Sequence, residues 1–425
     1  MTTATATDVE LKINAESSSL IEAIDPAIVV STKSTTDDNY MQGLITLTVD
    51  DGSLYAKAYG GRLALNMEIS DIHYPSVNLK TEKFGTATVG AKDLANALKS
   101  FPKNTDLDIT SNGKELTLAM QDDSSQYQSV TLSVNEVMTP PMADTFIKEI
   151  SLDRSLYLHG YDRIGFAVGD LEHKPTYLYW MLQYKDKFVR FAAGNGGRFA
   201  VINFEGDNCI KTSKNGCFYI PGDQSKTIAD IIKKVDDDHV KIKQAERTND
   251  QPDQIQFEMN AFTLMLVGFD TTIKWPNIDT IFDKPKEYRV ATNVADWDSP
   301  TQGLKATWNE DVKKEHDSHE SDIVPCLDEG YIYLTSQTGF RAKRKVPIVD
   351  VAQSGDIREG PTFYCNTKYI GEIFEKNDPK TKVELQYNYD PNATEPIFII
   401  PPKANNGSLG VTEHFQMFFA QLKKG

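Results

Sequence analysis

The sequence predicts an α+β fold made of three copies of one unit, in which antiparallel strands pack with one or two helices. Three observations support it. A pattern of a strand, a glycine turn, an arginine and a second strand occurs three times. A short strand that leads into an amphipathic helix follows each copy. The length of 425 residues leaves room for three ordinary domains. We place the units at 1–145, 146–284 and 285–425, because Pro and charged residues interrupt the apolar pattern near both boundaries.

The first repeated element is a hairpin. Its copies are "DGSLYAKAYGGRLALNMEI" from Asp51, "KDKFVRFAAGNGGRFAVINFEG" from Lys185 and "DEGYIYLTSQTGFRAKRKVPI" from Asp328, with Arg62, Arg198 and Arg341 after the turns. In the first copy, Leu54, Ala56 and Ala58 alternate with other residues before the turn, which is the period of a half-buried strand. Each copy therefore predicts two antiparallel strands joined by a tight turn.

The second repeated element is a short strand that leads into a helix. The copies are "TATVGAKDLANALKSF", "CFYIPGDQSKTIADIIKKV" and "TFYCNTKYIGEIFEK". In the middle copy Ile228, Ile231 and Ile232 have helical spacing, and Lys226 and Lys233 fall on the opposite side. One helix face is expected in the core and the other in solvent.

Composition limits the function classes. Lys and Arg number 45 against 61 Asp and Glu, a net charge of −16, which argues against a generally basic surface. No stretch reaches the roughly 18 to 20 apolar residues of a membrane span, and the start "MTTATATDVELK" lacks the pattern of an export signal. The four cysteines form neither a CxxC pair nor a dense disulfide framework. These features predict a cytoplasmic protein without membrane contact.

The order of these motifs resembles the bacterial β sliding clamp, the processivity subunit of the replicative DNA polymerase. The segment "RFAAGNGGRFAVINF" is similar to the family's hairpin that ends in Asp-Gly-His-Arg-Leu-Ala, with Gly197 in place of His. "IKWPNIDTIF" resembles its Phe-Pro-Asp-Tyr segment, and "YCNTKYIGEIF" resembles its Phe-Asn-x-x-Tyr-Leu helix. The chain is longer than the family pattern, notably at 244–254 and 308–322, which suggests a divergent clamp; its origin, in a cell or in a phage or mobile element, stays open.

This resemblance implies a non-catalytic homodimer without cofactor. Two chains would meet head to tail in a ring with strands outside and helices inside, encircle double-stranded DNA without reading its sequence, and tether the polymerase during DNA replication. For the first-unit edge of the dimer interface we expect Gln126 to Val134. The lysines expected to face DNA are Lys33, Lys92, Lys99, Lys226, Lys233, Lys368 and Lys376. Without the resemblance, lysines on exposed helix faces would be interpreted as solubility residues.

The resemblance also implies a pocket for short hydrophobic peptides of the DNA polymerase and the clamp loader. The corresponding residues are Leu178, Gly196, Gly197, Arg198, Phe199, Pro276 and Ile281, with Met417 in the place of a C-terminal methionine. Apolar side chains would bury the peptide, the glycines would let its backbone approach, and Arg198 would offer donors to its polar end. No proline follows Met417, so the C-terminal wall departs from the family pattern.

Other interpretations of individual motifs are weaker. "GNGGR" resembles a phosphate cradle, but a strand is expected after it rather than a helix, which favours a hairpin. "EHDSHE", from Glu315 to Glu320, and "VDDDH", from Val235 to His239, contain metal-ligand types but are more typical of solvated charged runs. No nucleophile motif predicts a hydrolase or nuclease. The main alternative is a clamp-fold scaffold that binds proteins without encircling DNA.

Overall fold

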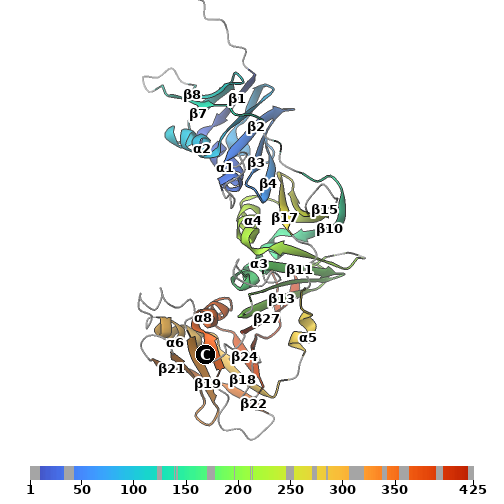
Figure 1. Ribbon diagram of the computed structural model, residues 1–425, viewed down its shortest axis with the longest axis vertical. Helices are drawn as coiled ribbons and strands as arrows, with labels where there is room; N and C mark the ends of the chain where they lie inside the picture. The colour runs from blue at the N-terminus through green and yellow to red at the C-terminus, as the bar shows by residue number, and fades with distance from the viewer. Residues whose placement is uncertain are drawn as a thin grey trace, which may run out of the picture. The chain divides into compact units, whose positions relative to one another are not determined.

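The computed structural model describes residues 10–32, 43–121, 127–137, 139, 142–169, 178–195, 197–210, 212, 214–245, 253–269, 275–283, 286–305, 320–336, 342–353, 363–388 and 396–419. By contacts the chain divides into two compact units, Met1–Arg154 with Gln224–Thr271, and Ser155–Asp223 with Thr272–Gly425 (Figure 1). Both units contain antiparallel sheets and helices, so the predicted α+β class is confirmed.

The elements follow one another in a threefold series. The first series consists of β1 (Leu11–Glu16), α1 (Ser17–Thr32), β2 (Leu44–Asp50), β3 (Ser53–Tyr59), β4 (Leu63–Ile69), η1 (Pro75–Val77), β5 (Lys80–Lys83), β6 (Gly85–Gly90), α2 (Ala91–Ser100), β7 (Asp106–Ser111), β8 (Glu115–Met120) and β9 (Ser129–Ser133). The second consists of β10 (Phe146–Asp153), α3 (Arg154–Ile164), η2 (Gly165–Ala167), β11 (Tyr179–Lys185), β12 (Phe188–Gly194), β13 (Arg198–Glu205), β14 (Gly216–Pro221), α4 (Gly222–Lys234), β15 (His239–Ala245), β16 (Asp253–Met259) and β17 (Phe262–Phe269).

The short helix α5 (Ile278–Phe282) precedes the third series. This series consists of β18 (Tyr288–Asn293), α6 (Ala295–Lys305), β19 (Glu320–Cys326), β20 (Tyr331–Ser336), β21 (Lys343–Pro347), β22 (Asp350–Gln353), β23 (Phe363–Asn366), α8 (Thr367–Glu375), β24 (Lys382–Tyr387), β25 (Ile397–Ile400), β26 (Ala404–Asn406) and β27 (Val411–Phe419). The three predicted strand-to-helix elements are confirmed as β6 with α2, β14 with α4, and β23 with α8.

Strand order repeats together with element order. In the three series the first four-stranded group runs β4-β3-β2-β6, then β13-β12-β11-β14, then β21-β20-β19-β23. The second group runs β1-β7-β8-β9, then β10-β15-β16-β17, then β18-β24-β25-β27, with short β5 and β22 added beside β1 and β18. The same two groups therefore recur three times, in the order the sequence repeats predicted.

Two of these groups continue into groups of the neighbouring series. β17 pairs antiparallel with β4, with Leu264 opposite Leu65, which makes an eight-stranded sheet. β27 pairs in the same way with β13, with Phe418 opposite Phe199. Both sheets cross the expected boundaries near 145 and 284, which explains why contacts give two compact units instead of three. The three-unit division remains a prediction.

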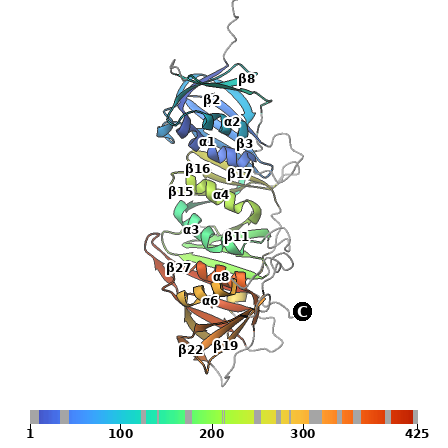
Figure 2. The same ribbon diagram turned by 90° about the vertical axis from the view of Figure 1, so that its left-hand side faces the viewer.

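Helix α1 covers a sheet with its apolar face. Leu20, Ala23, Ile24, Ala27 and Val30 of α1 are buried, and the helix packs on α2, β3 and β4 (Figure 2). The sequence pattern did not place α1, which holds Pro26, a residue rarely found inside a helix. In the other unit α6 packs on α8.

Candidate partner-binding site

The turn between β12 and β13 is a hairpin, as predicted. Asn195 organises it, because its Oδ1 accepts hydrogen bonds from the backbone N–H groups of Gly197 at 3.2 Å and Arg198 at 3.0 Å. A Cβ at Gly197 would lie 2.8 Å from Cε2 of Tyr369, so only glycine fits at this distance. The turn is therefore specified both by its own hydrogen bonds and by the close approach of α8.

Arg198 points into the protein. Its guanidinium carbon lies 4.3 Å from the ring centre of Tyr369 and 5.6 Å from that of Phe166, and it forms an ion pair with Glu372 on α8. The Arg198 side chain is 10 % exposed. Its charge is thus largely engaged by groups of the chain itself, which limits what it offers to a partner.

Aromatic rings surround Phe199 on the other face of β13. The Phe418 ring is stacked on Phe199 at 5.2 Å, and the rings of Trp275 and Phe282 lie at 5.6 and 6.5 Å. These three half-buried rings pack on a buried cluster of Met181, Ala192, Phe199, Val201 and Ile278. Such ring pairs each stabilise by roughly 0.5–1.5 kcal/mol beyond area burial.

The short helix α5 is fixed over this cluster at its start. Asn277 caps it, since its Oδ1 accepts from the backbone N–H of Thr280. Asp279 pairs with Nη2 of Arg190 at 2.7 Å, and Asn203 on β13 accepts from Nε of the same arginine at 2.7 Å. Arg190 is buried and Asp279 is exposed, so this contact links the surface of α5 to the sheet beneath it.

The structure brings most of the predicted pocket residues to this region. Gly197 and Arg198 lie at the turn, Pro276 is exposed directly before α5, and Ile281 is half-buried on α5. Leu178 is half-buried directly before β11. Gly196 lies outside the described residues.

Two of the predicted pocket residues are not surface residues. Met417 is 0 % exposed and pairs with Ala200 and Ile399 inside the sheet. Phe199 is 3 % exposed beneath its neighbouring rings. The expected exposed apolar patch is therefore closed at Phe199, and the expectation that Met417 forms an accessible C-terminal wall is corrected, because alternation along β27 directs it into the core.

Sequence reasoning did not assign site roles to Trp275, Phe282, Phe418, Tyr369 and Glu372. Trp275 was visible in the segment similar to Phe-Pro-Asp-Tyr, and Tyr369 in the helix motif. The contacts of Phe282 and Phe418 depend on the β13 and β27 pairing across some 220 residues of chain, for which the sequence carries no local signal.

The predicted DNA-facing lysines differ in their surroundings. Lys92 and Lys99 are exposed on α2, and Lys233 is exposed on α4. Lys226 is also exposed, but its Nζ lies 2.8 Å from Oδ2 of Asp230 one turn later. The helix pattern correctly predicted the solvent face of α4.

Of the remaining three predicted lysines, the structure describes the side chain of one. Lys376, directly after α8, pairs with Asp162 at 2.9 Å. Lys33 and the side chain of Lys368 lie outside the described residues. Two of the seven predicted lysines are thus already matched by carboxylates of the same chain.

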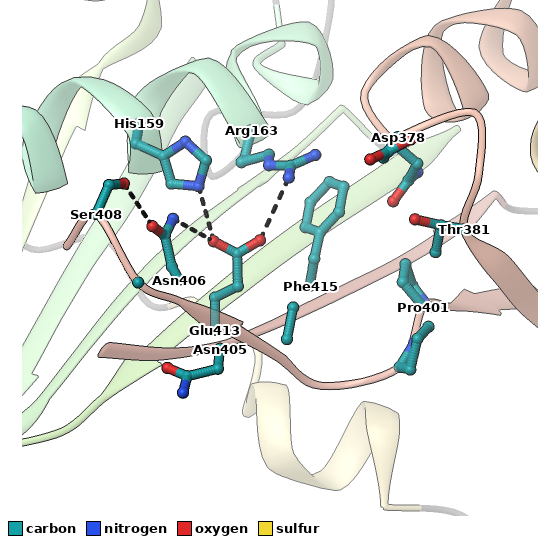
Figure 3. A pocket seen from close by; sticks show the side chains of 14 residues that line it. His159, Arg163, Asp378, Thr381, Pro401, Asn405, Asn406, Ser408, Glu413 and Phe415 are labelled. Carbon is teal, nitrogen blue, oxygen red and sulfur yellow. Dashed lines mark hydrogen bonds and ion pairs between the residues drawn. The ribbon is translucent and has the colours of Figure 1, made fainter. Parts of the chain in front are cut away.

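We call the pairing of β13 with β27, and likewise that of β4 with β17, a joint. A cavity of about 440 Å³ lies on the face of the β13–β27 joint opposite to Phe199 (Figure 3). It is bordered by α3, the loop after α8 and the β26–β27 turn. Glu413 on β27 accepts hydrogen bonds there from Nε2 of His159 at 2.9 Å and Nδ2 of Asn406 at 3.0 Å, and pairs with Arg163 at 3.3 Å. The Arg163 guanidinium lies 5.3 Å from the Phe415 ring centre.

The electrostatics of this cavity centre on Glu413. Burial alone would raise the pKa of Glu413, but the hydrogen bonds from His159 and Asn406 and the charge of Arg163 lower it to about 2. The carboxylate is therefore ionised at neutral pH, and it ties α3 to β27. Opposite charges share the cavity wall, so it concentrates neither anions nor cations.

In the part of the chain that the structure describes, no group of three His, Cys, Asp or Glu side chains is arranged to hold a metal ion. The "VDDDH" run follows the end of α4, where Asp237 accepts backbone N–H groups of His239 and Asn260. In "EHDSHE", residues 315–319 lie outside the described residues. None of the described helices is long and apolar enough to span a membrane.

Comparison with known proteins gives a structural answer. The sequence matches no protein-family model and no curated protein. The structure matches the β subunit of DNA polymerase from Streptococcus pyogenes with a TM-score of 0.76 at 14 % identity, over 97 % of this chain and 100 % of that one. The chain has the fold of bacterial β sliding clamps.

Other clamp structures agree. The Pseudomonas aeruginosa DnaN sliding clamp bound to griselimycin matches with a TM-score of 0.75 at 14 % identity, covering 98 % of this chain and 100 % of that chain. The β subunit from Thermotoga maritima matches with 0.73 at 13 % identity, over 98 % and 100 %. The clamp fold thus spans nearly the whole chain with a strongly diverged sequence.

Proposed function

We propose that this chain is a DNA sliding clamp: a non-catalytic homodimer in the cytoplasm that encircles duplex DNA and tethers a polymerase for processive synthesis. The observation that carries the proposal is the whole-length match to clamp structures. The unpaired edge strands β9 and β21 support it. A clamp performs no chemistry, which agrees with the lack of a catalytic motif in the sequence.

The strand edges support a dimer. Within the chain, β17 pairs with β4 and β27 pairs with β13, so two equivalent joints are closed internally. In both joints the last strand of a second group pairs with the end strand of a first group. The two strands of this kind that are left are β9 and β21, and each of them lies at the edge of its sheet among the described residues. A second copy placed head to tail would satisfy both edges and close a ring.

The backbone directions at these edges fit such pairing. Met120 N–H donates to Gln128 and Val134 N–H donates to Lys114, so the odd-numbered residues of β9 direct their backbone groups away from β8. On the other edge, the backbone carbonyl of Ala342 accepts a hydrogen bond from the backbone N–H of Ser336. The backbone groups of Lys343 and Lys345 are therefore directed away from β20. The expected interface segment 126–134 includes β9.

The DNA contact would come from exposed lysines such as Lys92, Lys99 and Lys233. Contacts of this kind are weak, exchangeable and screened by salt, as a ring that slides requires. The net charge of −16 is compatible with that role because it suppresses tight non-specific binding elsewhere. Polymerase and clamp loader would bind through short peptides at the cluster around Phe199.

The test combines imaging with DNA topology. Negative-stain images of the purified protein should show a ring with a central hole. After loading by its clamp loader, the protein should stay on closed circular DNA and leave when the circle is cut. Particles without a hole, or equal retention on cut and closed DNA, would refute the clamp.

A scaffold that does not encircle DNA is the second candidate. It is favoured by the pairing of Lys226 with Asp230 and of Lys376 with Asp162, which reduces the positive charge available to phosphates. Such a scaffold would bind the same protein partners whatever the DNA topology.

A further inference from the structure

The ring of Trp275 lies over the ring of Phe199. The two ring centres are 5.6 Å apart and inclined by 55°. Trp275 comes from the segment before α5, whereas Phe199 lies in β13, so this contact covers the sheet with a residue of the connecting segment. Together with Phe282 and Phe418, Trp275 leaves Phe199 buried.

Trp275 is held less firmly than its neighbours. Its indole N–H is buried and has no hydrogen-bond acceptor within the described part of the chain. A buried donor without an acceptor loses its bonds to water, and that loss works against the gain from ring packing. By contrast, Phe282 also packs on Phe398 and Phe418, at 5.4 and 5.9 Å.

The neighbouring residues allow Trp275 to move independently. Pro276 is exposed, and the fixed part of the segment begins at Asn277, which caps α5, and at Asp279, which pairs with Arg190. Rotation of Trp275 toward solvent would give its N–H access to water and uncover one side of Phe199, while α5 stays in place.

The equivalent joint between β4 and β17 is covered differently. There Ala64 takes the position of Phe199 at the end of the hairpin, opposite Met265; its covering ring, Tyr59, belongs to the same hairpin, and the described part of the linker contributes Met142 and Ala143. Of these two joints, the one between β13 and β27 alone has, among the described residues, an aromatic side chain of the sheet covered by a ring of the connecting segment.

We propose that Trp275 is a displaceable cover of the partner site, and that the occupant which replaces it is a short peptide with one bulky apolar anchor. The peptide as occupant rests on the proposed function, whereas the movement of Trp275 does not. Because the covered form does not bind, the apparent affinity is reduced by the fraction of covered molecules. Trp275 is then a competitor of the peptide and not a wall of its pocket.

The two roles predict opposite signs for one substitution. Trp275→Ala removes the competitor and should tighten binding about three- to tenfold, whereas loss of a wall would weaken it. Trp275→Phe keeps a ring over Phe199 without the unpartnered N–H, so it should favour the covered form and weaken binding. Ile72→Ala, at a residue that is 85 % exposed in the other compact unit, is the control and should change nothing.

The probe is a fluorescein-labelled Gly-Ser-Ser-Phe-Ser-Gly peptide, titrated by fluorescence anisotropy against the full-length protein. Weaker or unchanged binding to Trp275→Ala, or no binding to any variant at millimolar concentration, overturns the proposal. If the protein forms no ring, but Trp275→Ala binds the peptide more tightly and Trp275→Phe more weakly than the unchanged protein, the sliding-clamp function is refuted and the role of Trp275 as a cover stands.

A second measurement, on protein that keeps Trp275, guards against misfolding of Trp275→Ala. Trp180 and Trp297 are fully buried, so in a Trp308→Phe background iodide should quench mainly Trp275. Displacement predicts that saturating peptide raises iodide quenching at least twofold. Unchanged or reduced quenching in the peptide-bound protein contradicts the movement of Trp275.

Discussion

The carboxylate of Glu413 on β27 and the imidazole of His159 on α3 share a 2.9 Å hydrogen bond, although about 250 residues separate them in sequence. With Arg163 and Asn406 this bond ties the expected second and third units together on the side of the sheet opposite to Phe199. The joint between these units therefore has an ionic contact on one face and an aromatic one on the other.

Acid should loosen this joint. The folded-state pKa of Glu413, about 2, lies below that of an unfolded glutamate, so its stabilisation is complete above the unfolded value and is lost as the pH falls toward 2. The loss amounts to about 3 kcal/mol between roughly pH 5 and pH 2. Urea unfolding at several pH values should show that Glu413→Gln has a flatter acid branch than the wild type. Parallel acid branches would contradict the role of Glu413.

At neutral pH the same substitution should destabilise the protein by about 2–4 kcal/mol, because it leaves the charge of Arg163 partly buried without its counter-ion. Asp378→Asn, in an exposed residue at the rim of the same cavity, is the matched control and should cost less than about 0.5 kcal/mol. Equal effects of both changes in urea unfolding would rule out the ionic contact as the cause.

The free edge of β9 gives a prediction for assembly. Thr131→Pro removes a backbone N–H that faces away from β8, so the chain's own ladder stays intact while a partner strand loses a hydrogen bond. Sedimentation should show weaker dimerisation, by about tenfold or more, with unchanged circular dichroism. Thr131→Ala keeps the N–H and should remain dimeric, and a dimer unaffected by proline would exclude this edge.

The lysines should differ in their effect on DNA. Replacing Lys92, Lys99, Lys226, Lys233, Lys368 and Lys376 together by Ala should lower retention on circular DNA at low salt. Within the set, Lys92→Ala with Lys99→Ala should reduce the salt dependence of retention more than Lys226→Ala, because Asp230 already neutralises Lys226. Retention that is unchanged by all six replacements would show that DNA lies elsewhere.

The two apolar residues Phe199 and Ile281 should separate stability from binding. Phe199→Ala removes a buried ring and should destabilise the fold by about 3–5 kcal/mol. Ile281→Ala, on the half-exposed side of α5, should cost less than about 1.5 kcal/mol and weaken peptide binding roughly five- to tenfold. Thermal unfolding and a peptide titration on each variant would test this, and equal stability losses would contradict the burial of Phe199.

Local patterns in the sequence were sufficient for the repeated elements. Alternation predicted the β12–β13 hairpin, and helical spacing of Ile228, Ile231 and Ile232 predicted the buried face of α4. They were not sufficient for α1, because the internal Pro26 argues against a helix although the buried residues have helical spacing.

The candidate site was predicted only in part. Local pattern predicted the hairpin that holds Gly197 and Arg198, whereas their place in a partner pocket rests on the resemblance and stays a prediction. The burial of Phe199 and Met417 depends on the pairing of β13 with β27, which no local pattern encodes. Likewise, nothing near Arg190 in the sequence indicates its ion pair with Asp279 some 90 residues later.

The sheets shared between successive series also bear on how the chain tolerates cleavage. A fragment that ends at residue 145 would retain β4 but lose its neighbour β17, and one that ends at 284 would retain β13 but lose β27. Each fragment would present a newly unpaired apolar strand to solvent, which is a template for aggregation. Proteolysis at either expected boundary should therefore leave a nicked protein whose pieces stay associated, and separately expressed pieces should regain solubility only when they are mixed.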